Sequence, residues 1–263
     1  MPSGVMCVII LAFSAFISGV SGFGFSMVAL TLFSLLFDIK TSVVFLAAHT
    51  LACNIFQLVK LRKHLSFTRM LPLIAGALSG VPAGAYLLKN IDPWWIKKAL
   101  GLVIIIFVLQ QVIYRKEQKN GGIPPDAPGA GGTSAPARTC EAKNTKKTLA
   151  GLLAGAAGGA LMGGLLSGGP PIMIYALKES SDKYYIKSTL QSFFFFTSLY
   201  AIIIYLASGL MTAPLLMSSL LYLPATIAGT GLGILVFEKL SVSAFNKIVL
   251  ILITILGISM LFK

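Results

Sequence analysis

A succession of apolar segments, each long enough to cross a lipid bilayer, most constrains what this chain can fold into. A helix needs about 20 apolar residues to span the hydrocarbon core. The segments are Gly4–Phe37, Thr41–Val59, Met70–Leu88, Trp94–Tyr114, Leu149–Leu177, Tyr185–Ser208, Met211–Phe237 and Val242–Phe262. Because lipid offers no hydrogen bonds to the backbone, such segments are expected to be helical. The sequence predicts an all-α integral membrane protein with about eight transmembrane segments.

The distribution of charge supports a membrane protein over a nucleic-acid-binding one. Charged residues make up 11% of the chain, against about 25% in soluble proteins. The 21 Lys and Arg greatly outnumber the eight Asp and Glu, and they cluster between apolar segments, as in cytoplasmic membrane loops. The three cysteines show no metal or disulfide spacing. We expect membrane lipids as partners and no nucleic acid, metal or cofactor. Because no basic region precedes the first apolar segment, we also expect no cleaved signal peptide.

A polar stretch divides the chain. Residues 120–137 are rich in Gly, Pro, Ala and Ser, a composition that cannot bury a core and is typical of a disordered linker. We therefore expect three parts: a first transmembrane repeat at 1–114, a basic cytoplasmic linker at 115–148 and a second transmembrane repeat at 149–263.

The two halves resemble each other in the order of their landmarks. Residues 19–24 match 165–170 through a shared Ser-Gly, and residues 39–42 match 186–189. Gly80 and Gly84 match Gly229 and Gly233, and the offset drifts only from 146 to 149. Two repeats of four segments each are typical of secondary transporters.

The first segment of each half is too long for a single span. Gly4–Phe37 would extend about 50 Å as a straight helix, whereas the hydrocarbon core is about 30 Å thick. Glycines interrupt it near its middle. It is therefore either a tilted, glycine-broken span or a re-entrant hairpin.

Positive charge distinguishes these arrangements. If every segment simply crosses, 12 basic residues lie on one side and nine on the other. If the first segment of each half is a hairpin, the division becomes 16 against five, which the positive-inside rule favours. That arrangement inverts the second repeat, leaves both termini periplasmic and makes the linker cytoplasmic. We expect the bacterial inner membrane as the location.

The glycine-rich breaks are candidate binding elements. A half-helix that begins after a break points free N–H groups and a positive dipole end at the gap, which forms an anion site without a charged side chain. Close packing of helices through small residues is the alternative. The residues concerned are Ser21, Gly22 and Gly24 in the first break and Ser167, Gly168, Gly169 and Pro170 in the second.

Polar side chains inside apolar segments are further candidates, because such groups usually face a partner or a cavity. His49, Asn54 and Gln57 lie in the second segment, and Lys187 and Gln191 lie four residues apart on one face of the sixth. Interhelical hydrogen bonds are the alternative for the neutral groups. Lys187 either attracts an anion or extends to the cytoplasmic surface.

Two other mechanisms are weighed against anion binding. All eight acidic residues fall in loops or at segment edges, which disfavours a carboxylate proton relay and leaves His49 as the deep titratable candidate for proton coupling. Residues 19–22 read as the GxSG pattern of an intramembrane serine protease, with Ser21 as nucleophile and His49 as base. The second half repeats Ser-Gly without a histidine, so we expect a binding scaffold and no enzyme.

At these residues the sequence resembles the TauE/SafE family, the sulfite exporter or toluene-sulfonate uptake permease family. The first break at 21–24, the stretch 168–175 and the stretch 186–191 carry the resemblance, with Lys187 where many relatives have Arg. The resemblance implies transport of sulfite, sulfoacetate or other organosulfonates. A membrane potential negative inside drives anions outward, which favours export; uptake coupled to protons is the alternative. A homo-oligomer is compatible with this reading.

Overall fold

A computed structural model of the chain describes residues 4–21, 24–61, 67–120, 144–179, 183–237, 254, 255 and 257, and these are helical apart from short turns and breaks. The helices are α1 (Gly4–Ser21), α2 (Phe25–Leu36), α3 (Ile39–Leu61), α4 (Phe67–Asn90), α5 (Pro93–Asn120), α6 (Asn144–Leu165), α7 (Gly169–Glu179), α8 (Lys183–Ala207) and α9 (Ala213–Phe237). Most of the predicted last segment lies outside the described residues. So does the centre of the predicted linker, although α5 and α6 extend into its two edges.

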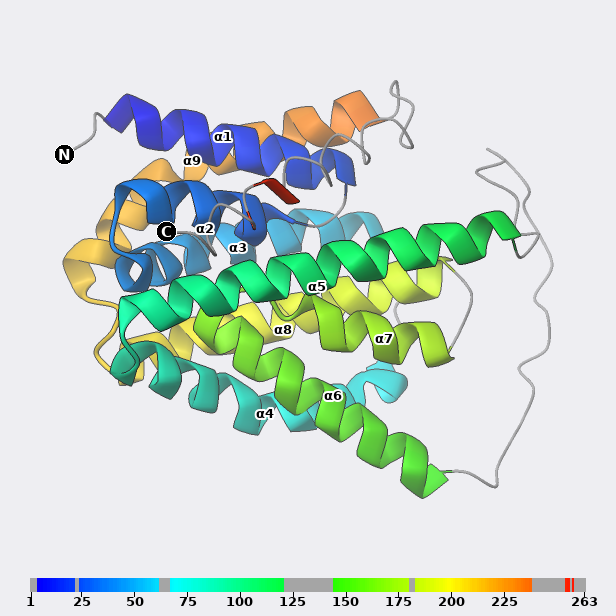
Figure 1. The fold of residues 1–263 in the computed structure, drawn as a ribbon. Coiled ribbons are helices and arrows are strands. Elements are labelled where there is room, and N and C mark those ends of the chain that lie inside the picture. The colour runs from blue at the N-terminus through cyan, green and yellow to red at the C-terminus, as the bar shows by residue number, and fades with distance from the viewer. Residues whose placement is uncertain are drawn as a thin grey trace.

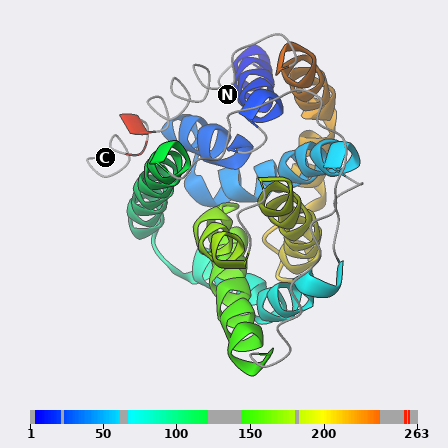
Figure 2. The ribbon, with the colours of Figure 1, turned by 90° about the vertical axis from the view of Figure 1, so that its right-hand side faces the viewer.

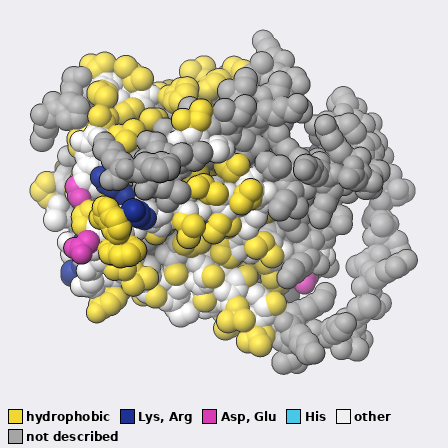
Figure 3. All heavy atoms as spheres, in the orientation of Figure 1, with side chains coloured by type: hydrophobic (Ala, Val, Ile, Leu, Met, Phe, Trp, Pro, Cys, Tyr) yellow, Lys and Arg dark blue, Asp and Glu magenta, His cyan; other side chains and the backbone are white. Residues whose placement is uncertain are grey.

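The described helices have the dimensions and surface of a membrane bundle. Six of them are long and apolar enough to cross a bilayer, and α1 and α2 are shorter apolar helices. Large apolar side chains such as Leu71, Met217 and Leu221 are at least 70% exposed, as suits contact with lipid. Figure 3 shows hydrophobic side chains across the middle of one face, with the described Lys and Arg side chains at its left end. The chain is a multi-pass membrane protein.

Each overlong segment is broken into two helices. Gly24, between α1 and α2, has φ 91°, a left-handed conformation that glycine adopts without steric cost. In the second break, Leu166 has φ 52°, which costs a residue with a side chain about 1–2 kcal/mol. Leu166 is only 2% exposed, so tight packing holds it in this strained conformation.

The two helices of each broken segment run in opposite directions (Figure 1). In the second pair, Ile172 of α7 packs with Phe193 of α8, and Ala176 packs with Ile186, so α7 is antiparallel to α8. Figure 1 shows α6 and α8 running the same way, which makes α6 and α7 a hairpin. In the first hairpin, α1 runs alongside and parallel to α9, and α2 turns back toward the start of α3.

Two helix pairs lie at opposite edges of the bundle, with α3 and α8 between them (Figure 2). Each pair includes the first helix of one hairpin. One pair is α1 with α9 and the other is α4 with α6. In the second pair, Gly76, Gly80 and Gly84 recur every four residues on α4 and face the backbone of α6 around Ala156 and Ala160. Small residues at this spacing allow two backbones to approach closely in a membrane.

We predict that Gly80→Ala separates α4 from α6 and destabilises the protein. A Cβ at Gly80 would clash with the backbone carbonyl oxygen of Ala156, and overpacking of this kind typically costs about 1–3 kcal/mol. Thermal unfolding of the detergent-solubilised protein measures the effect. Gly231→Ala is the matched control, since a Cβ on this helical glycine meets no described atom within 4 Å. Equal unfolding temperatures for the two variants would contradict the prediction.

Candidate functional site

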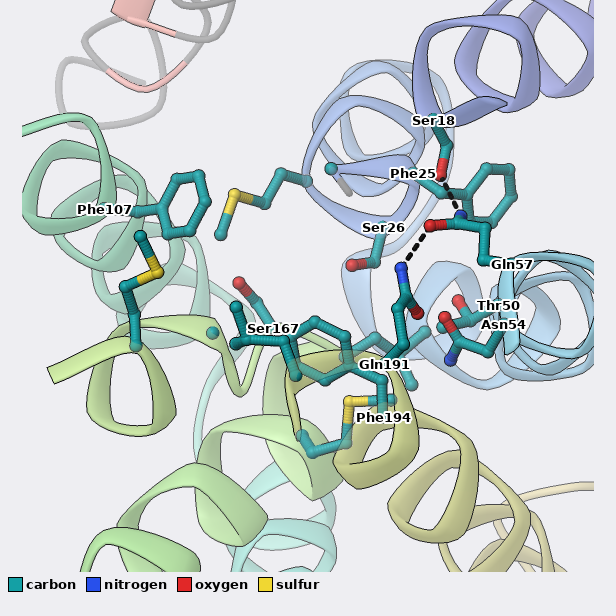
Figure 4. Close-up of a pocket in the computed structure, with 17 residues that line it drawn as sticks. Ser18, Phe25, Ser26, Thr50, Asn54, Gln57, Phe107, Ser167, Gln191 and Phe194 are labelled. Atoms are coloured by element: carbon teal, nitrogen blue, oxygen red, sulfur yellow. Dashed lines mark hydrogen bonds between the residues drawn. The ribbon is translucent and has the colours of Figure 1, made fainter. Parts of the chain in front are cut away.

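A cavity of about 60 Å³ lies where the two helix breaks meet α3, α5 and α8 (Figure 4). A buried water needs about 10–15 Å³ of volume measured in this way, so the cavity has room for several waters or a small guest. The residues that line it are Ser18, Gly24, Phe25, Ser26, Met27, Thr50, Asn54, Gln57, Phe107, Met162, Leu166, Ser167, Gly169, Met173, Leu190, Gln191 and Phe194.

The first break presents the N-terminus of α2 to this cavity. Gly24, Phe25, Ser26 and Met27 all line it, and no side chain caps the helix at Gly24. The backbone N–H of Val28 donates to the carbonyl of Gly24. The three amides before it have no acceptor within the helix, as at every helix start. They and the positive end of the helix dipole favour a negative guest.

The main polar group that the second break contributes is the hydroxyl of Ser167, and the helix that follows it contributes less. Ser167 is 3% exposed, and its Oγ has no hydrogen-bond partner among the described residues. In Figure 4 the Ser167 and Ser26 hydroxyls point into the same space from opposite sides. The start of α7 offers few backbone donors, because Pro170 and Pro171 follow Gly169 and have no N–H. The two breaks are therefore chemically unequal.

A chain of hydrogen bonds closes one wall of the cavity by joining three helices. The Gln191 side-chain amide on α8 donates to Gln57 Oε1 on α3. Gln57 Nε2 in turn donates to Ser18 Oγ on α1 over 2.9 Å, and both bonds are drawn in Figure 4. All three side chains are at least 94% buried. Gln57 thus ties the first hairpin to α8.

A row of polar side chains along one face of α3 also lines the cavity. Thr50, Asn54 and Gln57 lie at the i, i+4, i+7 spacing of one helical face, and all three line the cavity. Asn54 Nδ2 donates to Ser198 Oγ on α8 over 3.3 Å. The sequence analysis named Asn54 and Gln57 as intramembrane polar residues but selected only Asn54 for the site and missed Thr50, although this spacing could have grouped all three.

His49 lies on a different face of α3. Its Nδ1 is 2.8 Å from Thr226 Oγ1 on α9, and its ring packs 5.1 Å from that of Phe45. It does not line the cavity. Along the same seam, Cys53 Sγ lies 3.3 Å from Thr230 Oγ1. His49 therefore contacts α9 on a face of α3 that does not line this cavity.

The other predicted site residues divide into three groups. Gly24, Asn54, Ser167, Gly169 and Gln191 line the cavity together. Gly168 and Pro170 are buried beside it without lining it, and a Cβ on Gly168 would meet the carbonyl oxygen of Gly158. Ser21 ends α1 and Lys187 lies in α8, but their side chains are outside the described part, as is all of Gly22.

The described lining consists of dipoles and apolar groups. Backbone amides, hydroxyls and carboxamides supply its polarity, and three methionines and three phenylalanines supply most of the rest. Among these lining residues no carboxylate, amine, imidazole or thiol is present to act as an acid, base or nucleophile.

The fold and the cavity define a multi-pass helical membrane protein with a small cavity of mixed polar and apolar lining between two broken helices. The chain belongs to the sulfite exporter TauE/SafE family, whose family model matches residues 7–260. The resemblance found in the sequence is thereby confirmed. Members of this family are membrane transporters, so the serine protease reading of Ser21 and His49 was wrong. No curated protein and no solved structure matches the chain.

We predict that Gln57 and Gln191 are energetically coupled. Replacing either by Leu leaves buried polar groups without a partner, at a cost of about 1–3 kcal/mol. Replacing both removes the pair, so the double variant should lose less stability than the sum of the single losses, by about 0.5–3 kcal/mol. Denaturation of the wild type, both single variants and the double variant in detergent measures this coupling. Strictly additive losses would show that the two amides do not interact.

Proposed function

We propose that the chain transports small sulfur-containing anions such as sulfite, sulfoacetate or other organosulfonates, and that it binds them between the two helix breaks. One observation carries the proposal: the start of α2 and the hydroxyl of Ser167, which has no partner among the described residues, border one small cavity from opposite breaks. Hydrogen-bond donors aimed at a low-dielectric site attract negative charge. Gln191 and Asn54 add carboxamide donors, and Ser21, Gly22 and Lys187 are further candidates from the sequence.

We also propose that the two halves are inverted repeats. The third helix of the chain and its counterpart in the second half, α3 and α8, cross in opposite directions, because Asn54 meets Ser198 while Gln57 meets Gln191. When the two halves are exchanged, α1 corresponds to α6 and α4 corresponds to α9. The pair of α1 with α9 therefore corresponds to the pair of α6 with α4. Inverted repeats around a central site allow the site to open to either side alternately.

Export is the direction that we propose, with the bacterial inner membrane as the location. A potential negative inside drives each negative charge outward with about 2.3 kcal/mol per 100 mV, so export runs without a coupling ion. The positive-inside rule favours a cytoplasmic linker and periplasmic termini. Lys40 Nζ donates to the carbonyl of Lys89, so the start of α3 and the end of α4 lie together, and we propose that this end of the bundle faces the periplasm.

We predict that Ser167→Ala lowers sulfite flux while leaving stability nearly unchanged. The hydroxyl has no described partner to lose, whereas a bound anion would lose a charge-assisted hydrogen bond worth about 1.5–3 kcal/mol, or about tenfold or more in affinity. Efflux of sulfite from proteoliposomes measures the first effect and thermal unfolding the second.

Ser219→Ala is the matched control for this prediction. Ser219 is also fully buried, and its hydroxyl donates to the carbonyl of Phe45, away from the cavity. It should lose stability and keep the wild-type affinity for sulfite. If both variants carried sulfite with wild-type affinity, Ser167 would be excluded from the binding site.

A further inference from the structure

The lining of the cavity has a polar side and an apolar side. Figure 4 shows Asn54 and Gln57 of α3 on one side of the cavity and Phe107 of α5 on the other. The hydroxyls of Ser26 and Ser167 lie between them. A guest in the cavity therefore meets hydrogen-bonding groups and an aromatic ring at the same time.

The apolar side is built around Gly169 at the start of α7. A Cβ on this glycine would lie 3.2 Å from Phe107 Cε2 and 3.7 Å from Phe194 Cζ, so both rings approach it closely. Met173 follows one turn later on α7, and all four residues line the cavity. Phe107 is 4% exposed, whereas Phe194 is half-buried. Phe107 is therefore the more firmly packed of the two rings.

We propose that the substituent on the sulfur of the guest lies against this apolar side, and that Phe107 limits the size of the substituent that the site accepts. The oxygens of the guest then face the start of α2 and the polar side chains. This inference rests on the proposed function and names a specificity-determining residue of the same site. It ranks the proposed guests and excludes none of them.

The physical reason is that an organosulfonate is itself polar at one end and apolar at the other. Its oxygens accept hydrogen bonds, and each CH₂ group buried against apolar side chains improves affinity about fourfold. Sulfite has no such substituent, and that of sulfoacetate ends in a carboxylate, so both gain less from the apolar side. A short alkanesulfonate is the guest that both sides of the cavity fit.

The size limit follows from the stiffness of the ring. A methionine such as Met173 adapts its shape to a guest, because its side chain is flexible. The ring of Phe107 is buried against the backbone at the start of α7, and a close-packed interior resists its displacement. A flat, bulky substituent such as the ring of benzenesulfonate would have to displace Phe107.

Two substitutions change this limit in opposite directions. Phe107→Ala removes the ring, and an apolar cavity left by a deleted side chain can bind an aromatic guest. Phe107→Leu is the milder version, which serves if the alanine variant does not fold. Gly169→Ala instead adds a methyl group between Phe107 and Phe194, where the nearest atoms belong to side chains and not to backbone. It retains the backbone N–H of the residue.

Phe33→Ala is the matched control. Phe33 on α2 is 3% exposed, so it is buried like Phe107. Its ring stacks on those of Phe37 and Phe45 and does not line the cavity. Its loss should lower stability without changing the ranking of guests.

The experiment uses proteoliposomes of the purified full-length chain, loaded with unlabelled methanesulfonate. It measures the uptake of labelled methanesulfonate in exchange, and the inhibition of this uptake by unlabelled ethanesulfonate and benzenesulfonate. A parallel assay with labelled sulfite tests the proposed function. Thermal unfolding of each variant shows whether it is folded.

For the wild type, we expect ethanesulfonate to inhibit about fourfold more strongly than unlabelled methanesulfonate, and benzenesulfonate to inhibit more weakly than ethanesulfonate. Phe107→Ala should strengthen benzenesulfonate relative to ethanesulfonate by about tenfold or more, and Phe107→Leu should shift the ratio in the same direction. Gly169→Ala should reduce the advantage of ethanesulfonate over methanesulfonate. Phe33→Ala should leave both ratios at the wild-type values.

Unchanged ratios in the folded Phe107 and Gly169 variants, or an equal shift in Phe33→Ala, would overturn the inference. Transport of sulfite without any transport of methanesulfonate would also overturn it, while leaving the proposed function standing. If neither labelled sulfite nor labelled methanesulfonate moved, the proposed function would fail, and this inference with it.

Discussion

The structure depends on how a broken helix is accommodated inside a membrane. A break leaves backbone amides without helical partners, and lipid cannot satisfy them. Here residues of both breaks lie inside the bundle, where they line a small cavity together with residues of α3 and α8. The same unsatisfied amides that make a break costly make it a site for a negative guest.

Close packing of small residues makes this arrangement possible. The glycines of α4 and α6, and those at the contact between α1 and α9, remove the side chains that would keep the hairpins at a distance. The two hairpins are thus held at their outer helices, and residues at the start of both shorter inner helices line the central cavity. The strain of Leu166 in the second break indicates how firmly this packing holds the backbone next to Ser167.

The sequence predicted the helical membrane class, the two breaks and five of the residues that line the cavity, because glycine patterns and overlong apolar segments are local signals. It could not predict which face of α3 turns inward. His49 was selected for its chemistry, yet the rotation of α3 turns it toward Thr226, while Thr50 and Gln57 face the cavity. Ser18 was missed because its role arises from a contact with Gln57 across 39 residues of chain. The two-repeat division stays a prediction.

The central claim is that a small anion binds between the two breaks. Selenite and alkylselenonates are close analogues of sulfite and sulfonates, and selenium can be located by anomalous diffraction from crystals soaked at the absorption edge. The account predicts a single strong selenium peak between the start of α2 and Ser167, within hydrogen-bond reach of Gln191, that is lost on competition with methanesulfonate. A selenium peak that is displaced by sulfonate but lies outside this cavity would contradict it.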